Sequence, residues 1–189
     1  MIEIRWHGRG GQGAKTIALL FADAALKQGK HIQAFPEYGP ERMGAPVAAF
    51  NRISEKPIRI HCGVTEPNVV VILDPTLISV VPVTSGLNPE TGTIVVNSPE
   101  SPAELRKKLK FSGRIFTIDA LKIAEECIGK PIPNMPMLGA MVKATGMLEI
   151  APMIDEVKSK ITEKFKHKPE VIEGNIKAVK RSFEEVKSE

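Results

Sequence analysis

The chain has 189 residues, of which 42% are hydrophobic and 25% charged, as expected for one soluble globular domain with its own core. No apolar run approaches the roughly 20 residues of a membrane-spanning helix, and the N-terminus enters a strand-like pattern without a signal peptide. We therefore expect a cytoplasmic protein. The net charge of +4 arises within residues 1–61, which hold nine Lys and Arg against five Asp and Glu. This bias suits an anionic ligand or an acidic partner, and is too small and scattered to predict nucleic-acid binding.

The first 35 residues predict a strand, a glycine-rich loop, a helix and a second strand. Residues 2–6 alternate apolar and polar side chains, as strands do, and residues 31–35 form the second strand-like run. Between them, an apolar face at helical spacing ends near Gly29 and consists of Ile17, Leu20, Phe21, Ala24 and Ala25. This order predicts two parallel strands joined by a right-handed crossover.

The middle of the chain predicts more strands. Residues 36–46 are dense in turn formers and have no helical period, so they predict a loop. Residues 47–53 and 58–60 indicate an antiparallel hairpin, which makes the sheet mixed. The apolar runs 69–73, 93–96 and 115–118 are typical of buried, mostly parallel strands.

Helices dominate the remainder. Ser101 and Glu104 form a capping-box pattern that starts a helix to about Leu109, and a short helix over 120–128 stops at Gly129. Everything after about Met137 has helical spacing. With no linker or repeat, we predict a single three-layer α/β domain over residues 1–189, with a mixed, mostly parallel sheet and a helical C-terminal third.

The sequence does not indicate a metal site or a catalytic nucleophile. The two cysteines, Cys62 and Cys127, are too few for an iron–sulfur cluster held by this chain alone, since such clusters normally take four thiolates. A disulfide is unexpected in a cytoplasmic protein, so we predict two ordinary buried thiols. No Ser–His–Asp or Cys–His arrangement stands out, and no residue is assigned as catalytic or metal-binding. His7 and His61 lack a partner carboxylate at a suggestive spacing, which favours structural roles.

The candidate binding residues begin with the glycine-rich loop, Gly8, Arg9, Gly10, Gly11, Gln12 and Gly13. Glycines there would let the backbone approach a ligand, and the following helix would offer free N–H groups to phosphate. A nicotinamide site would need an acidic residue ending the second strand, where the sequence has residues 33–36, Gln-Ala-Phe-Pro. A P-loop would need glycine and lysine contiguous, and Ala14 separates them. The loop therefore either packs at a subunit interface or contacts an anionic cofactor, and a stand-alone NAD-dependent oxidoreductase is the alternative.

Other candidates lie outside that loop. Tyr38, Glu41 and Arg42 belong to the loop at 36–46, which is either a rigid recognition loop or a solvated charged segment. Lys15 is a possible phosphate ligand beside Arg9. Asn134 would cap or clamp the turn before the helix at Leu138. Asp74 ends an apolar strand, where site residues occur, although helix capping is the commoner role.

Three segments together resemble a known family. They are residues 7–13 (His-Gly-Arg-Gly-Gly-Gln-Gly), 38–46 (Tyr-Gly-Pro-Glu-Arg-Met-Gly-Ala-Pro) and 134–140 (Asn-Met-Pro-Met-Leu-Gly-Ala). In this order, they resemble the gamma subunit of 2-oxoacid:ferredoxin oxidoreductases, above all pyruvate synthase. The resemblance extends over essentially the whole chain. Met43 departs from the glycine that many relatives have there.

The resemblance implies a non-catalytic subunit of an enzyme that converts a 2-oxoacid and coenzyme A to acyl-CoA and carbon dioxide while reducing ferredoxin. It implies alpha and beta subunits that hold thiamine diphosphate, magnesium and substrate, and a delta subunit that carries [4Fe-4S] clusters. This chain would hold no cofactor alone and would help to seat coenzyme A. The choice of 2-oxoacid would lie in other subunits. A purely architectural subunit is the remaining alternative.

Overall fold

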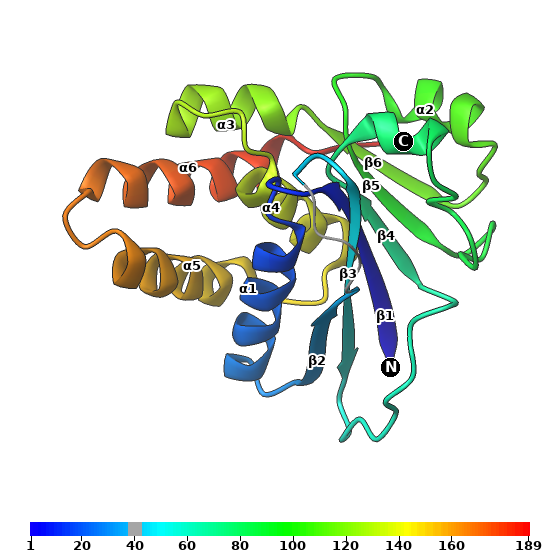
Figure 1. Cartoon of the computed structure of the whole chain (residues 1–189), viewed down its shortest axis with the longest axis horizontal. Helices are drawn as coiled ribbons and strands as arrows, with labels where there is room; N and C mark the ends of the chain where they lie inside the picture. Colours follow the sequence, from blue (N-terminus) through cyan, green and yellow to red (C-terminus); the bar gives the residue numbers. More distant parts are fainter. Residues whose placement is uncertain (38–42) are drawn as a thin grey trace.

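In the computed structural model, which describes residues 1–37 and 43–189, strands and helices are interspersed over the first two thirds of the chain and helices dominate the remainder (Figure 1). The strands are β1 (Ile2–Arg9), β2 (His31–Pro36), β3 (Pro46–Ser54), β4 (Val69–Ile72), β5 (Thr93–Asn97), β6 (Arg114–Ile118) and β7 (Lys187–Ser188). The helices are α1 (Ala14–Lys27), the 3-10 helix η1 (Pro75–Ser79), α2 (Pro102–Leu109), α3 (Ala120–Ile128), α4 (Asn134–Thr145), α5 (Ile150–Lys164) and α6 (Pro169–Glu185).

The described strands form one sheet in the order β2-β3-β1-β4-β5-β6-β7. β1, β4, β5 and β6 run parallel at its centre, while β3 and β7 pair antiparallel with their neighbours. The predicted α/β class, with a mixed sheet that is parallel in its core and a helical C-terminal region, is therefore confirmed.

Two predicted pairings are wrong. β2 does not lie beside β1, because β3 is inserted between them and pairs with both. Residues 58–60 form no strand, since both edges of β3 are already taken by β1 and β2. The antiparallel hairpin of this region is instead β2–β3.

Helices cover both faces of the sheet, which explains the continuous apolar runs in its central strands. Val69 and Val71 of β4 contribute to the larger core, which α1 and α4 complete. Val70 and Ile72 point to the opposite face, into a smaller core with η1 and α2. On the first face, α5 and α6 form an antiparallel pair that extends beyond the sheet (Figure 1).

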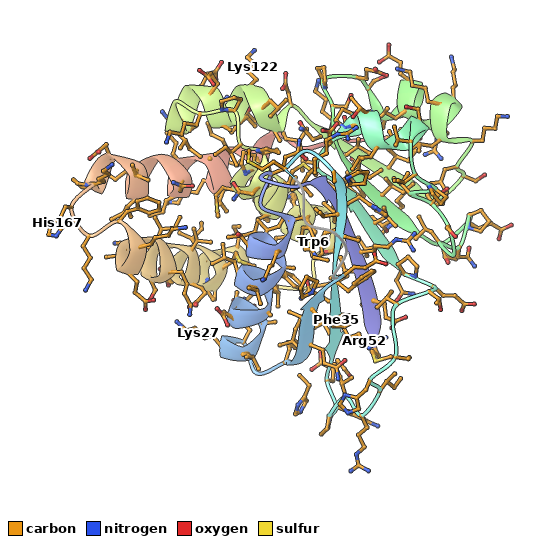
Figure 2. All side chains as sticks on the ribbon, viewed as in Figure 1. Trp6, Lys27, Phe35, Arg52, Lys122 and His167 are labelled. Atoms are coloured by element: carbon orange, nitrogen blue, oxygen red, sulfur yellow. The ribbon has the colours of Figure 1, made fainter. Side chains whose placement is uncertain are left out.

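Buried polar groups fix the register of the first three strands. The Trp6 indole donates to Asn51 Oδ1 (2.7 Å), and Asn51 Nδ2 donates to the Ala18 carbonyl in α1 (3.0 Å). On the other face, Arg52 binds Glu3 at 2.6 Å and lies 5.3 Å from the centre of the Phe35 ring (Figure 2). The bond from Asn51 to Ala18 attaches α1 to the sheet and so helps to fix where the glycine-rich loop leaves β1.

The predicted helix starts and stops are confirmed where capping chemistry sets them. Ser101 and Glu104 form the reciprocal capping box of α2, and α3 ends at Gly129 in the left-handed conformation. The helical C-terminal region begins with α4 at Asn134, three residues earlier than predicted. Within the described ranges, no helix is long and apolar enough to cross a membrane.

Candidate functional site

The glycine-rich loop follows β1 at the point where the order of the strands in the sheet reverses direction. β1 leads through α1 to strands on one side, whereas its parallel neighbour β4 leads to β5 on the other side. The carboxyl ends of two such strands border the crevice in which open α/β sheets bind ligands. Residues 8–13 and Asp74 follow or end these two strands and so lie at that position.

Asp74 organises the loop. Its Oδ2 accepts hydrogen bonds from Arg9 Nε (3.1 Å) and Gln12 Nε2 (2.9 Å), and Gln12 Oε1 in turn accepts from the Arg9 backbone N–H (2.8 Å). Asp74 also caps η1 by accepting from the Thr76 N–H and hydroxyl. Burial alone would raise the pKa of the Asp74 carboxyl, but the Thr76 and Gln12 hydrogen bonds and the Arg9 charge outweigh it and lower the pKa. The carboxylate is therefore a charged anchor for the loop.

Arg9 is engaged in holding the loop together. Besides Asp74, its guanidinium donates to the Gly44 carbonyl (3.0 Å) and to Thr76 Oγ1 (2.8 Å). Three of its five N–H donors are thus used within the chain. Arg9 is consequently better placed to position the loop than to serve as the main ligand of a phosphate.

The second motif meets the first through the backbone. Gly10 N–H donates to the Ala45 carbonyl (2.9 Å), and Gly44 N–H donates to the Gly10 carbonyl (3.2 Å). The end of the loop at 36–46 is therefore joined to the glycine-rich loop. The candidates Tyr38, Glu41 and Arg42 lie outside the described residues.

The third motif, residues 134–140, packs against Gly13 through Asn134. A Cβ on Gly13 would lie 2.7 Å from Asn134 Nδ2, closer than real Cβ contacts allow, and the glycine has φ +83°. Asn134 is the first residue of α4, and its Oδ1 accepts from the Met135 N–H (2.8 Å). The position requires glycine for two reasons, conformation and space. Three segments distant in the sequence thus meet at the start of α1.

A cleft of about 400 Å³ opens beside this junction, lined by residues from the glycine-rich loop, the start of α1, the end of β2 and β3. Among the described residues, no acceptor pairs with the backbone N–H groups of Ala14, Lys15 and Thr16. Gly13 provides no capping side chain, and the first turn of α1 contains no acidic residue. Free N–H groups and the positive end of a helix dipole make this turn suitable for an anion. Exposed Lys15 adds a positive charge, while Glu37 is the described acidic residue in the lining.

The histidine candidates do not form an acid–base site in the described structure. His7 is half-buried and accepts a hydrogen bond from Arg5 Nε at its Nε2 (3.0 Å). Burial, with the Arg5 charge adding to it, lowers the pKa of His7 to about 4. The imidazole is therefore neutral near pH 7, and its structural role stays a prediction. His61 is exposed on a loop away from the cleft.

The cysteines are unpaired, as predicted, but Cys62 is exposed rather than buried and Cys127 is half-buried. In residues 1–37 and 43–189, no group of three or more His, Cys, Asp or Glu is arranged to hold a metal ion. Asp74 is the site residue whose importance the sequence understated. The available signal was an acidic residue at the end of an apolar strand, which also fits its capping role.

Comparison with known proteins gives the family. Residues 3–185 match the family described as pyruvate ferredoxin/flavodoxin oxidoreductase. Pyruvate synthase subunit PorC from Thermotoga maritima is 46% identical over 98% of this chain and 94% of its own. The common gamma subunit of the pyruvate and ketoisovalerate oxidoreductases from Pyrococcus abyssi is 49% identical over 97% of this chain and 96% of its own.

The fold agrees with these sequences. The crystal structure of the Thermotoga maritima subunit superposes with a TM-score of 0.85 at 44% identity, over 99% of this chain and 97% of the other. The family expected from three short motifs is therefore confirmed by the whole length of the chain. The chain belongs to the pyruvate ferredoxin/flavodoxin oxidoreductase family, as a gamma-type subunit of a multi-subunit 2-oxoacid:ferredoxin oxidoreductase.

Proposed function

We propose that this subunit helps to seat coenzyme A in the complex, with the cleft beside Gly8–Gly13 receiving a phosphate group of the ligand. In the reaction that the complex would catalyse, pyruvate, coenzyme A and oxidised ferredoxin are converted to acetyl-CoA, carbon dioxide and reduced ferredoxin. The main supporting observation is that three segments meet around a helix start whose N–H groups have no described partner. Coenzyme A carries several phosphate charges, which such a turn suits.

The residues in and beside the cleft divide into two roles. Backbone N–H groups of the first turn of α1 and the Lys15 ammonium would contact a phosphate directly. Arg9, Gln12 and Asp74 would hold the loop in place through their mutual hydrogen bonds. A loop fixed before binding loses less entropy when the ligand arrives, so these positioning contacts contribute to affinity.

The redox chemistry is assigned to partner chains. We propose alpha and beta subunits that hold thiamine diphosphate, magnesium and the 2-oxoacid, and a delta subunit with [4Fe-4S] clusters that passes electrons to ferredoxin. Two described free cysteines in this chain are consistent with that division. The Pyrococcus abyssi relative is named as common to pyruvate and ketoisovalerate oxidoreductases, which supports placing substrate choice outside this subunit.

The decisive variants are Lys15→Ala and Lys15→Glu in the assembled complex. A charge-assisted contact is worth about 1.5–3 kcal/mol, so the KM for coenzyme A should rise by about tenfold or more for alanine and further for glutamate. The KM for pyruvate and kcat should not change. Lys107→Ala, an exposed lysine of α2 away from the cleft, is the matched control.

Equal coenzyme A KM values in all four proteins would contradict the proposal and leave an architectural subunit. Titration of the lone chain with NADH, followed by nicotinamide fluorescence, tests the NAD-dependent alternative. We expect no saturable binding, since β2 ends in Phe35 and Pro36 rather than in an acidic residue that would hold the ribose.

A further inference from the structure

A second groove, here called the lysine groove, lies on the other side of the glycine-rich loop. It has a volume of about 580 Å³ and is bounded by α1, the end of α5, the start of α6 and the connection from α3 to α4. Gly11, Gly13 and Thr16 line both hollows, so the groove adjoins the cleft. Figure 2 shows His167 at the tip of the α5–α6 pair, between the two helix ends that border the groove.

The groove is strongly basic. Its lining includes Lys130, Lys160, Lys164 and Lys168, which come from three separate parts of the chain, and Asp23 is its described acidic residue. Asp23 pairs with Lys160 at 3.3 Å. Within residues 1–37 and 43–189, no carboxylate lies within ion-pair distance of the other three lysines. Three positive charges therefore surround the groove without internal compensation.

Apolar side chains are exposed within the same groove. Leu19 of α1 is 44% exposed and Ile132 before α4 is 38% exposed, so two large aliphatic side chains face solvent in this groove. Half-buried Phe165 lines the same groove, with Lys164 Nζ 5.7 Å from its ring centre. An apolar floor rimmed by uncompensated charge is typical of a surface that a partner covers.

We propose that the lysine groove docks an acidic amphipathic segment of another subunit of the same oxidoreductase complex. The segment would place apolar side chains on Leu19 and Ile132, and Asp or Glu side chains opposite Lys130, Lys164 and Lys168. The exposed Leu19 and Ile132 support a polypeptide over a small polyanion, because a phosphate group would leave both apolar side chains uncovered. The inference rests on membership of a multi-subunit complex and is independent of coenzyme A binding.

The test is assembly of the complex with reversed charge. Lys164→Glu with Lys168→Glu is compared with Lys177→Glu and Lys180→Glu, two exposed lysines of α6 outside the groove. Each chain is co-produced with the remaining subunits, and its affinity for them is measured by analytical ultracentrifugation. We expect the groove variant to bind at least about tenfold more weakly and the control to bind like the unmodified chain.

A second pair of variants tests the apolar contact. Leu19→Ser removes an exposed side chain from the groove floor, and Leu121→Ser removes an exposed leucine of α3 elsewhere. Both side chains are exposed, so the lone chains should unfold at similar urea concentrations. Only Leu19→Ser should weaken assembly. In the unmodified complex, the affinity for the other subunits should fall as salt concentration rises.

Unchanged assembly of both groove variants would overturn the proposal. If assembly is unchanged and the KM for coenzyme A rises, the groove is a site for a small anion, which also overturns it. The result is distinguishable from that of the proposed function, because Lys15 variants change the coenzyme A KM with the complex intact, whereas groove variants change assembly.

Discussion

Gly13→Ala tests the close packing of the glycine-rich loop, at Gly13, against Asn134 at the start of α4. Gly13 has φ +83°, and a methyl group there would lie 2.7 Å from Asn134 Nδ2. The left-handed conformation costs an alanine about 1–2 kcal/mol. Moving Asn134 aside would also break its hydrogen bond to the Met135 N–H, which is worth about 1 kcal/mol. We expect a loss of about 2–3 kcal/mol in the free energy of unfolding.

Gly11→Ala is the matched control. Gly11 also has a positive φ, +96°, but within residues 1–37 and 43–189 no atom beyond its chain neighbours lies within 4 Å of the position that its Cβ would take. Only the backbone strain applies, so the expected loss is about 1–2 kcal/mol. The difference between the two variants therefore measures the contact with Asn134.

Urea unfolding of the lone chain supplies these numbers. Trp6 is the single tryptophan and is fully buried, so its fluorescence reports unfolding of the core. Adding Asn134→Ala to Gly13→Ala should recover part of the lost stability, because it removes Asn134 Nδ2, the atom nearest the new methyl group. Equal losses for the Gly11 and Gly13 variants, with no recovery in the double variant, would refute the described junction.

Two further predictions concern partly buried polar groups. The pKa of His7 is about 4 in the folded chain and about 6.5 when unfolded, so the stability that it contributes is lost as the pH falls from about 6.5 toward 4. His7→Gln should therefore remove about 2 kcal/mol of the stability difference between pH 7 and pH 5 in urea titrations; an unchanged difference would mean that His7 is protonated in the fold. Asp74→Ala should cost about 2–4 kcal/mol, since it leaves Arg9 and Gln12 without their acceptor, whereas Asp119→Ala removes only the cap of α3 and should cost about 1 kcal/mol. Similar losses for the two aspartates would contradict the anchoring role.

Most of the helices and strands could be predicted from local sequence patterns. Apolar runs and capping patterns located the central strands and the helices, because burial on both faces and helix ends leave marks in adjacent residues. The position of β3 did not follow from such signals. Its insertion between β1 and β2 depends on pairing along both of its edges, which involves residues far apart in the sequence.

The three motifs of the site were predicted separately. That they meet at one place in the fold was not predicted. Gly13 and Asn134 are in contact although 121 positions separate them, and Asp74 joins the loop through side chains whose partners no local pattern reveals. The lysine groove was missed for the same reason, since Lys130 and Lys164 come together only through packing. Roles for Tyr38, Glu41 and Arg42 remain predictions from the sequence.

Hydrogen–deuterium exchange of the assembled complex, with and without coenzyme A, tests the central claim most directly. We predict that coenzyme A slows exchange in the peptide covering residues 10–16, where the free N–H groups lie, and leaves residues 82–88 unchanged. Unaltered exchange over residues 10–16 under saturating coenzyme A would contradict the account.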